Sequence, residues 1–134
     1  MRPYRNWLAT FLWMGVIFFL SSRPADELPS FGLYDLLLKK SGHLSGYAIL
    51  GWLFLRSWES LGIHTQRAQM LALLSSVLYA ITDEFHQSFV PGRHASVIDV
   101  LIDTAGIALG VFAFGLLKHK WQWMSNGPFP SQRS

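Results

Sequence analysis

ITDEFHQSFVPGRHASVIDVLID, residues 81–103, places four acidic side chains, two histidines and one arginine where two long apolar segments meet. The apolar segments are residues 70–80 and residues 97–117. Charged groups in hydrocarbon cost several kcal/mol unless they are paired or hydrated, so they are seldom accidental there. We therefore expect this stretch to join two membrane helices and to hold the functional centre of the protein.

The composition of the whole chain indicates a membrane protein. Hydrophobic residues make up 51% of the 134 residues and charged residues 14%, whereas charged residues are about 25% of typical soluble domains. The mean hydropathy is only +0.27 because apolar blocks alternate with polar links. This segregation predicts a single domain over residues 1–134, of the all-α class, folded as an integral membrane bundle of four transmembrane helices.

Four apolar segments are candidates for the transmembrane helices. They lie near residues 4–22, 43–58, 68–88 and 97–117, and a helix needs roughly 20 residues to cross about 30 Å of hydrocarbon. We expect residues 23–42 to form a loop that includes a short interfacial helix from Leu33. Lys118, His119 and Lys120 are expected to end the last helix, and residues 121–134 are expected to be disordered.

Four spans place both termini on one side of the membrane, and the basic residues indicate which side. The side with the termini would hold Arg2, Arg5, Arg56, Arg67, Lys118, Lys120 and Arg133, and the other side would hold Arg23, Lys39, Lys40 and Arg93. The side richer in lysine and arginine is normally cytoplasmic. The sequence thus predicts a multi-pass protein of the plasma (inner) membrane with both termini in the cytoplasm, and it places residues 83–96 on the external side.

Polar side chains occupy matching faces on three of the predicted helices. On the third predicted helix, with 100° between successive residues, Asp83, Glu84, His86 and Gln87 all lie on one half of the helix surface. Phe85 points almost in the opposite direction. On the fourth helix, Asp99 and Asp103 share a stripe with Gly106 and Gly110, whose lack of a side chain would let a neighbouring backbone approach closely. On the second helix, positions i, i+3 and i+7 are Lys40, His43 and Tyr47. Three helices therefore direct ionisable groups toward one region.

The link between the last two helices predicts a turn at Val90-Pro91-Gly92-Arg93, because proline fixes one dihedral angle and glycine accepts unusual ones. Ser96 is a suitable N-cap for the last helix, and Asp99 is placed to complete a capping box, which is an ordinary structural role for a carboxylate. Arg93 is placed either to bridge carboxylates or to hold an anionic ligand through two hydrogen bonds.

Taken in order, these residues resemble the VanZ-like family of small membrane proteins. The matching pieces are Lys40-Ser-Gly-His43 with Tyr47 and Leu50-Gly51, then Asp83-Glu84-Phe-His-Gln87, then Val90-Pro91-Gly92-Arg93, then Ser96 with Asp99 and Gly106. The family usually has asparagine at the position of Asp103 and often an acidic residue at that of Gly46. The resemblance implies four membrane helices and, for the family's namesake, glycopeptide resistance directed at teicoplanin, but no agreed biochemical activity.

One hypothesis is an intramembrane enzyme that modifies a lipid-linked or amphiphilic substrate of the cell envelope. The candidate catalytic residues are His43, as a base near neutral pH, with Asp83 and Glu84 as the carboxylates that orient it or act beside it. The candidate substrate-binding residues are Lys40, Tyr47, Gln87, Arg93, Asp99 and Asp103. The sequence has no nucleophile elbow, phosphate loop or HExxH motif, so it leaves open whether the protein is an enzyme.

Two further hypotheses use the same residues without turnover. In one, the polar cluster recognises and shields an envelope ligand, such as a membrane lipid, a lipid-linked cell-wall precursor or a glycopeptide. In the other, the charged groups pair only to fix the packing and register of the helices. The sequence does not determine the oligomeric state.

Metals, cofactors and nucleic acid are not expected as partners. The chain has no cysteine, which excludes disulfides and thiolate ligands. His43 and His86 with nearby carboxylates would suit zinc or manganese, but a lone histidine in such a motif is more often a hydrogen-bonding partner. The net charge of +3 comes from residues that flank the apolar blocks, so it favours membrane lipids over nucleic acid.

Overall fold

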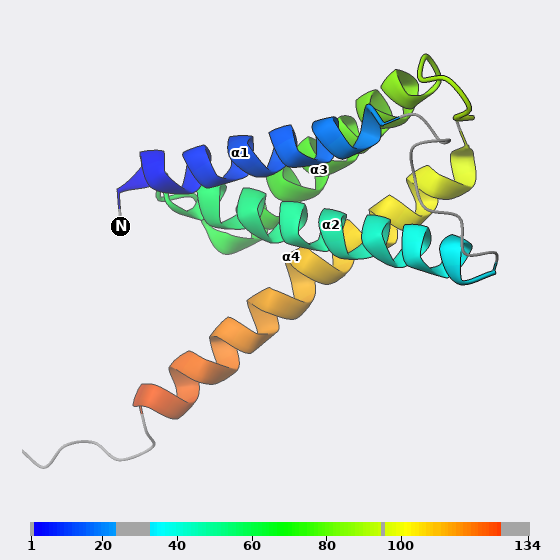
Figure 1. Ribbon diagram of the computed structural model, residues 1–134. Coiled ribbons are helices and arrows are strands. Elements are labelled where there is room, and N and C mark those ends of the chain that lie inside the picture. The colour runs from blue at the N-terminus through cyan, green and yellow to red at the C-terminus, as the bar shows by residue number, and fades with distance from the viewer. Residues whose placement is uncertain (1, 24–32, 95, 127–134) are drawn as a thin grey trace, which may run out of the picture.

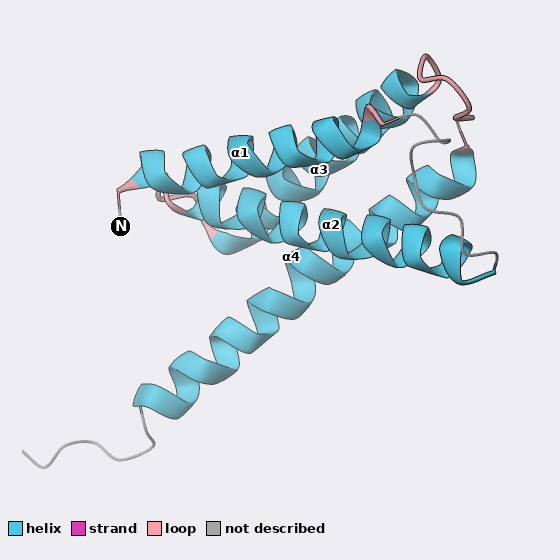
Figure 2. Ribbon diagram, in the orientation of Figure 1, coloured by secondary structure: helices cyan, strands magenta, loops and turns pink. Residues whose placement is uncertain are grey.

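Residues 2–23, 33–94 and 96–126 are described by the computed structural model, and they form four α-helices with no strand among them (Figure 2). The helices are α1 (Pro3–Ser21), α2 (Leu33–Glu59), α3 (Thr65–Gln87) and α4 (Val97–Asn126). The predicted all-α class is confirmed. The predictions for residues 24–32 and 127–134 lie outside the described residues.

The four helices alternate in direction, and α2 and α3 hold the arrangement together. In Figure 1, α1, α2 and α3 lie side by side, while α4 crosses them and its last turns extend away. α2 and α3 each contact all three other helices, whereas α1 and α4 do not touch within the described ranges. The ends of α1 and α3 therefore meet the starts of α2 and α4 at one end of the bundle. The polar stretch of residues 81–103 lies at this end.

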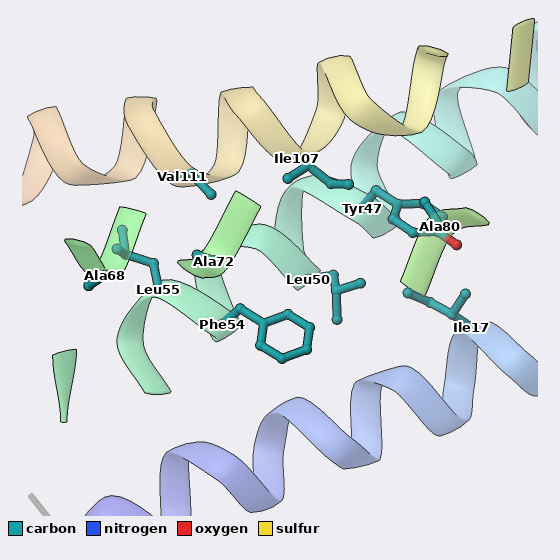
Figure 3. Close-up of a cluster of buried hydrophobic side chains, with 10 residues drawn as sticks. All are labelled: Ile17, Tyr47, Leu50, Phe54, Leu55, Ala68, Ala72, Ala80, Ile107 and Val111. Carbon is teal, nitrogen blue, oxygen red and sulfur yellow. The ribbon is translucent and has the colours of Figure 1, made fainter. Parts of the chain in front are cut away.

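Small side chains let α3 approach its neighbours. Ala68, Ala72, Ser76 and Ala80 recur at every fourth position and are fully buried, so they form one stripe along the helix. Larger apolar side chains from the other helices fill the space beside that stripe (Figure 3). They are Ile17, Tyr47, Leu50, Phe54, Leu55, Ile107 and Val111.

Two glycines of α4 let this helix approach α2 closely, as the sequence predicts. A Cβ atom added to Gly110 would overlap the carbonyl oxygen of Ala48 and lie 2.9 Å from its Cα. A Cβ atom added to Gly106 would likewise overlap the carbonyl oxygen of Leu44. Backbone atoms on both sides leave no room for a side chain, so the predicted small-residue contact is confirmed.

Two helix boundaries differ from the sequence prediction. α2 begins at Leu33, so the separate interfacial helix expected before residue 43 is wrong, and those residues are the first turns of α2. α4 does not end at Lys118 but continues to Asn126, and residues 121–126 are helical rather than disordered. Lysine is a good helix former, so Lys118 and Lys120 do not end the helix. After them, the first pair of residues that typically ends a helix is Gly127-Pro128.

The predicted turn between α3 and α4 is confirmed. Gly92 has a φ of 75°, in the region that side-chain-bearing residues avoid. The backbone N–H of Arg93 donates to the carbonyl oxygen of Val90 at 3.1 Å. With Pro91 and Gly92 at its central positions the turn fits type II, and it leads the chain from the end of α3 toward the start of α4.

Large apolar side chains cover the outside of all four helices. More than half of the surface is exposed for Phe11 and Leu12 on α1, Leu37 and Leu38 on α2, Leu74, Leu78 and Phe85 on α3, and Leu101 and Leu116 on α4. By length and hydropathy, one helix of the described chain, over Val97–Ser125, is long and apolar enough to cross a membrane. The four spans and the cytoplasmic termini therefore stay predictions.

Candidate functional site

A pocket of about 610 Å³ opens at the polar end of the bundle. Buried polar side chains form its floor, namely Ser21, Tyr47, Asp83 and Gln87. More exposed side chains form its rim, namely Lys39, Lys40, Arg93, His94 and Asp99. Apolar side chains of α1, including Trp13, Ile17 and Leu20, form one wall. The pocket thus joins a polar floor to a largely basic rim along an apolar surface.

Asp83 is the centre of a hydrogen-bond network at the floor. Its Oδ2 accepts from the hydroxyl of Tyr47 at 2.8 Å, from the hydroxyl of Ser21 at 2.9 Å and from Nε2 of Gln87 at 3.3 Å. Gln87 Nε2 also donates to Ser21 Oγ at 3.2 Å. Because the donors come from α1, α2 and α3, one carboxylate oxygen ties three helices together.

The predicted polar face of α3 is confirmed by its burial. The exposed fractions of Asp83, Glu84 and Gln87 are 4%, 5% and 4%, whereas that of Phe85 is 67%. A helix with this pattern carries its polar groups inward and its large apolar groups outward, which is the reverse of an amphipathic helix in a water-soluble protein.

His43 is bonded to a carboxylate from α4. Its Nδ1 lies 3.0 Å from Oδ1 of Asp103, which is 1% exposed. An ionised carboxylate only accepts, so when Asp103 is ionised and His43 is neutral, Nδ1 carries the proton and Nε2 keeps its lone pair. The carboxylate that orients His43 is therefore Asp103, and the prediction that Asp83 or Glu84 does so is wrong. Asp103 does not line the pocket, whereas His43 does.

Glu84 joins the end of α3 to the start of α4. Its Oε1 accepts the backbone N–H of Ser96 at 2.7 Å, directly before the first residue of α4. The predicted capping box assigned this N–H to Asp99, so that part of the prediction is wrong. Asp99 is half-buried at the rim of the pocket instead, and Glu84 does not line the pocket.

Arg93 binds backbone carbonyl groups at the end of α1. Its Nε donates to the carbonyl oxygen of Arg23 at 3.0 Å, and its Nη2 donates to that of Leu20 at 3.5 Å. A cation is favourable there because the last carbonyl groups of a helix lack intrahelical partners. Arg93 bridges no carboxylate among the described residues, but it lines the pocket, so contact with an anionic ligand stays a prediction.

Seven of the nine predicted site residues line the pocket. The other two, Glu84 and Asp103, act on a backbone N–H and on His43. The seven are Lys40, His43, Tyr47, Asp83, Gln87, Arg93 and Asp99.

The family model described as VanZ/LLP1 matches residues 6–118, which include every residue of this site. The chain belongs to the VanZ/LLP1 family. The resemblance inferred from the polar motifs is thereby confirmed. No curated protein and no solved structure matches the chain.

The two histidines considered as metal ligands in this VanZ/LLP1 protein lie in separate surroundings. His86 Nε2 is 3.0 Å from Ser22 Oγ, and its ring stacks on Phe18 with the ring centroids 4.5 Å apart. His43 is bonded to Asp103. Within the described ranges, no three histidine, aspartate or glutamate side chains are grouped closely enough to hold a metal ion.

Helix α1 contributes to the VanZ/LLP1 site in ways that the sequence did not predict. Ser21 donates to Asp83, and Trp13 Nε1 donates to the carbonyl oxygen of Gly46 at 2.9 Å. The one available signal was a pair of hydroxyl side chains, Ser21 and Ser22, at the end of an apolar helix.

Proposed function

We propose that this VanZ/LLP1 protein is a multi-pass plasma-membrane protein whose four helices all cross the bilayer, with both termini in the cytoplasm. Exposed apolar side chains on every helix support this arrangement, since soluble monomers rarely expose large contiguous apolar patches. The carboxylates of α3 and α4 also support this arrangement, because they are buried in the bundle and not on its apolar surface. The distribution of lysine and arginine supports a pocket on the external side of the membrane.

We further propose that the pocket modifies a lipid-linked or amphiphilic substrate of the cell envelope. The observation that carries this proposal is the hydrogen bond from His43 to the buried Asp103, with His43 lining the pocket. A neutral imidazole held by a carboxylate through Nδ1 is suited to accept a proton at Nε2. Lys40 and Arg93 at the rim are suited to an anionic group of the substrate.

A non-catalytic role is the second candidate, and the contacts of two predicted site residues favour it. Glu84 and Arg93 both bind backbone groups at helix ends, which is a structural task. In this alternative the polar cluster either recognises and shields an envelope ligand without changing it, or only fixes the packing of the helices. The same chemistry of rim and floor serves either role.

Family membership suggests a connection with glycopeptide resistance of the teicoplanin type. We propose that this protein affects glycopeptide susceptibility through a membrane lipid, a lipid-linked cell-wall precursor or the glycopeptide itself. Teicoplanin-type glycopeptides and lipid-linked precursors are both amphiphilic, and a pocket with a polar floor and an apolar wall suits such molecules.

Replacing His43 by glutamine tests the catalytic role. We expect His43→Gln to leave the fold intact, because glutamine can still donate to Asp103, and to lower turnover by about 10²–10⁴-fold through loss of the base. The measurements are the glycopeptide susceptibility of cells that express the variant and mass spectrometry of their envelope lipids. His119→Gln is the matched control, because His119 is exposed on α4 and does not line this pocket.

Three outcomes separate the alternatives. A normal yield of folded His43→Gln protein with the phenotype and the lipid change both lost supports the enzyme. A normal yield with the phenotype retained contradicts catalysis by His43 and favours the binding role. A loss of folded protein favours a purely structural role for the hydrogen bond between His43 and Asp103.

A further inference from the structure

Asp83 has one carboxylate oxygen that no described residue satisfies. Its Oδ2 accepts all three donors of the floor, while its Oδ1 is buried and has no hydrogen-bond partner in the described part of the chain. Asp83 itself lines the pocket. A buried acceptor without a donor costs free energy, and a ligand that brings a donor recovers it. A cationic donor is preferred, because the group it meets is a carboxylate.

The rim of the same pocket has the opposite charge. Lys39, Lys40 and Arg93 line it, and among the described lining residues Asp99 is the only acidic side chain at that level. Lysine and arginine together form a common binding site for phosphate oxygens. A ligand that fits the whole pocket therefore has a positive end on the floor and a negative group at the rim.

The apolar wall continues from the pocket onto the outer surface. Val16 and Leu20 on α1 and Leu38 on α2 all line the pocket, yet 44%, 57% and 63% of their surfaces are exposed. Side chains that border both the pocket and the exterior mark a lateral opening between α1 and α2. In a bilayer this opening meets the lipid phase, so an acyl chain can lie against the wall while its headgroup enters the pocket.

From these three features we infer that the pocket binds a phospholipid whose headgroup carries a phosphate and a primary ammonium, with the ammonium at the carboxylate of Asp83 and the phosphate near Lys40 and Arg93. The inference rests on the proposed placement in a membrane. It does not require turnover, because it concerns recognition of the lipid alone.

The order of affinities for three headgroups tests this inference. The full-length protein in detergent is titrated with phosphatidylethanolamine, phosphatidylglycerol and phosphatidylcholine that carry identical acyl chains, and the bound lipid is counted by native mass spectrometry. We expect phosphatidylethanolamine to bind about tenfold more tightly than phosphatidylcholine, whose quaternary ammonium has no N–H to donate. Phosphatidylglycerol, with uncharged hydroxyl donors, should lie between them.

Two variants assign the preference to the two ends of the pocket. Asp83→Asn keeps an acceptor for the floor hydroxyls but loses the charge, so the preference for phosphatidylethanolamine should disappear. Lys40→Gln should weaken all three lipids alike, by about fivefold, because each carries the same phosphate. Lys120→Gln, an exposed lysine of α4 outside this pocket, is the control and should change nothing.

Equal affinities for phosphatidylethanolamine and phosphatidylcholine would overturn the inference, as would a preference that survives in Asp83→Asn. Tighter binding of phosphatidylglycerol than of phosphatidylethanolamine would also overturn the inference, because it would mean that the pocket prefers a hydroxyl donor to an ammonium. If Asp83→Asn does not fold, the headgroup order of the unmodified chain and the effect of Lys40→Gln decide the matter. Failure here leaves the His43→Gln experiment unaffected, so the two proposals fail separately.

Discussion

Replacing Gly110 by leucine is expected to destabilise the folded state severely. A Cβ atom at this position would overlap the carbonyl oxygen of Ala48, and backbone atoms in the middle of α2 cannot move aside without separating α2 from α4. Overpacking of a core costs about 1–3 kcal/mol when side chains can adjust, so we expect at least about 3 kcal/mol where they cannot. The measurement is the free energy of unfolding in mixed detergent micelles, followed by circular dichroism.

Gly115→Ala is the matched control on the same helix. A Cβ atom at Gly115 would meet only Nε2 of Gln69 at 3.6 Å, which is an ordinary contact, and alanine favours helix over glycine by about 1 kcal/mol. This variant should be as stable as the unmodified protein or slightly more stable. A folded Gly110→Leu protein of normal stability would contradict the packing of α4 on α2.

Replacing Asp83 by leucine is expected to destabilise the bundle by about 3 kcal/mol. Ser21, Tyr47 and Gln87 would each lose their shared acceptor, and a buried donor without a partner costs roughly 1–3 kcal/mol. Relief of the buried negative charge offsets part of this cost. The free energy of unfolding of Asp83→Leu and of Asp83→Asn, which keeps an acceptor oxygen, measures the difference.

A double-mutant cycle with Tyr47 shows whether the network causes the loss. Tyr47→Phe in the unmodified chain removes a hydrogen bond to a carboxylate, which costs about 1.5–3 kcal/mol. In the Asp83→Leu chain the same change removes a donor that has lost its acceptor, so it should be neutral or stabilising. Equal costs in both backgrounds would mean that the hydrogen bond between Tyr47 and Asp83 contributes nothing to stability.

Features that depend on one helix alone could be predicted from the sequence. The spacing of Asp83, Glu84, Gln87 and Phe85 determines which of them share a face, and the structure buries the first three and exposes Phe85. The interval between Gly106 and Gly110 similarly predicts a close backbone contact, although it does not say that α2 is the partner.

Features that depend on where helices end relative to each other could not be predicted. Glu84 accepts the N–H of Ser96 because the link from α3 folds back to bring the two together. Arg93 reaches the carbonyl groups of Leu20 and Arg23 for the same kind of reason, across some 70 residues of sequence. The spacing of polar and apolar residues along one helix does not predict such contacts between distant segments.

The pairing within the site was partly missed for a related reason. The sequence predicts Asp103 as one more carboxylate of a polar stripe, and it pairs His43 with Asp83 or Glu84 instead. The stripe predicts a direction, whereas the partner depends on the depth at which α4 crosses α2. The close contact at Gly106 and Gly110 sets that depth, and Asp103 lies one turn before it, at the level of His43.

The central claim is a four-span bundle whose pocket end faces the outside of the cell, and labelling of single cysteines in intact cells tests it most directly. The chain has no cysteine, so His94→Cys at the pocket rim and Leu61→Cys in the link between α2 and α3 each give one reactive site, and both positions are exposed. We expect a membrane-impermeant maleimide to label His94→Cys in intact cells and Leu61→Cys only after the membrane is permeabilised. Labelling of both positions from outside, or of Leu61→Cys alone, would contradict the account.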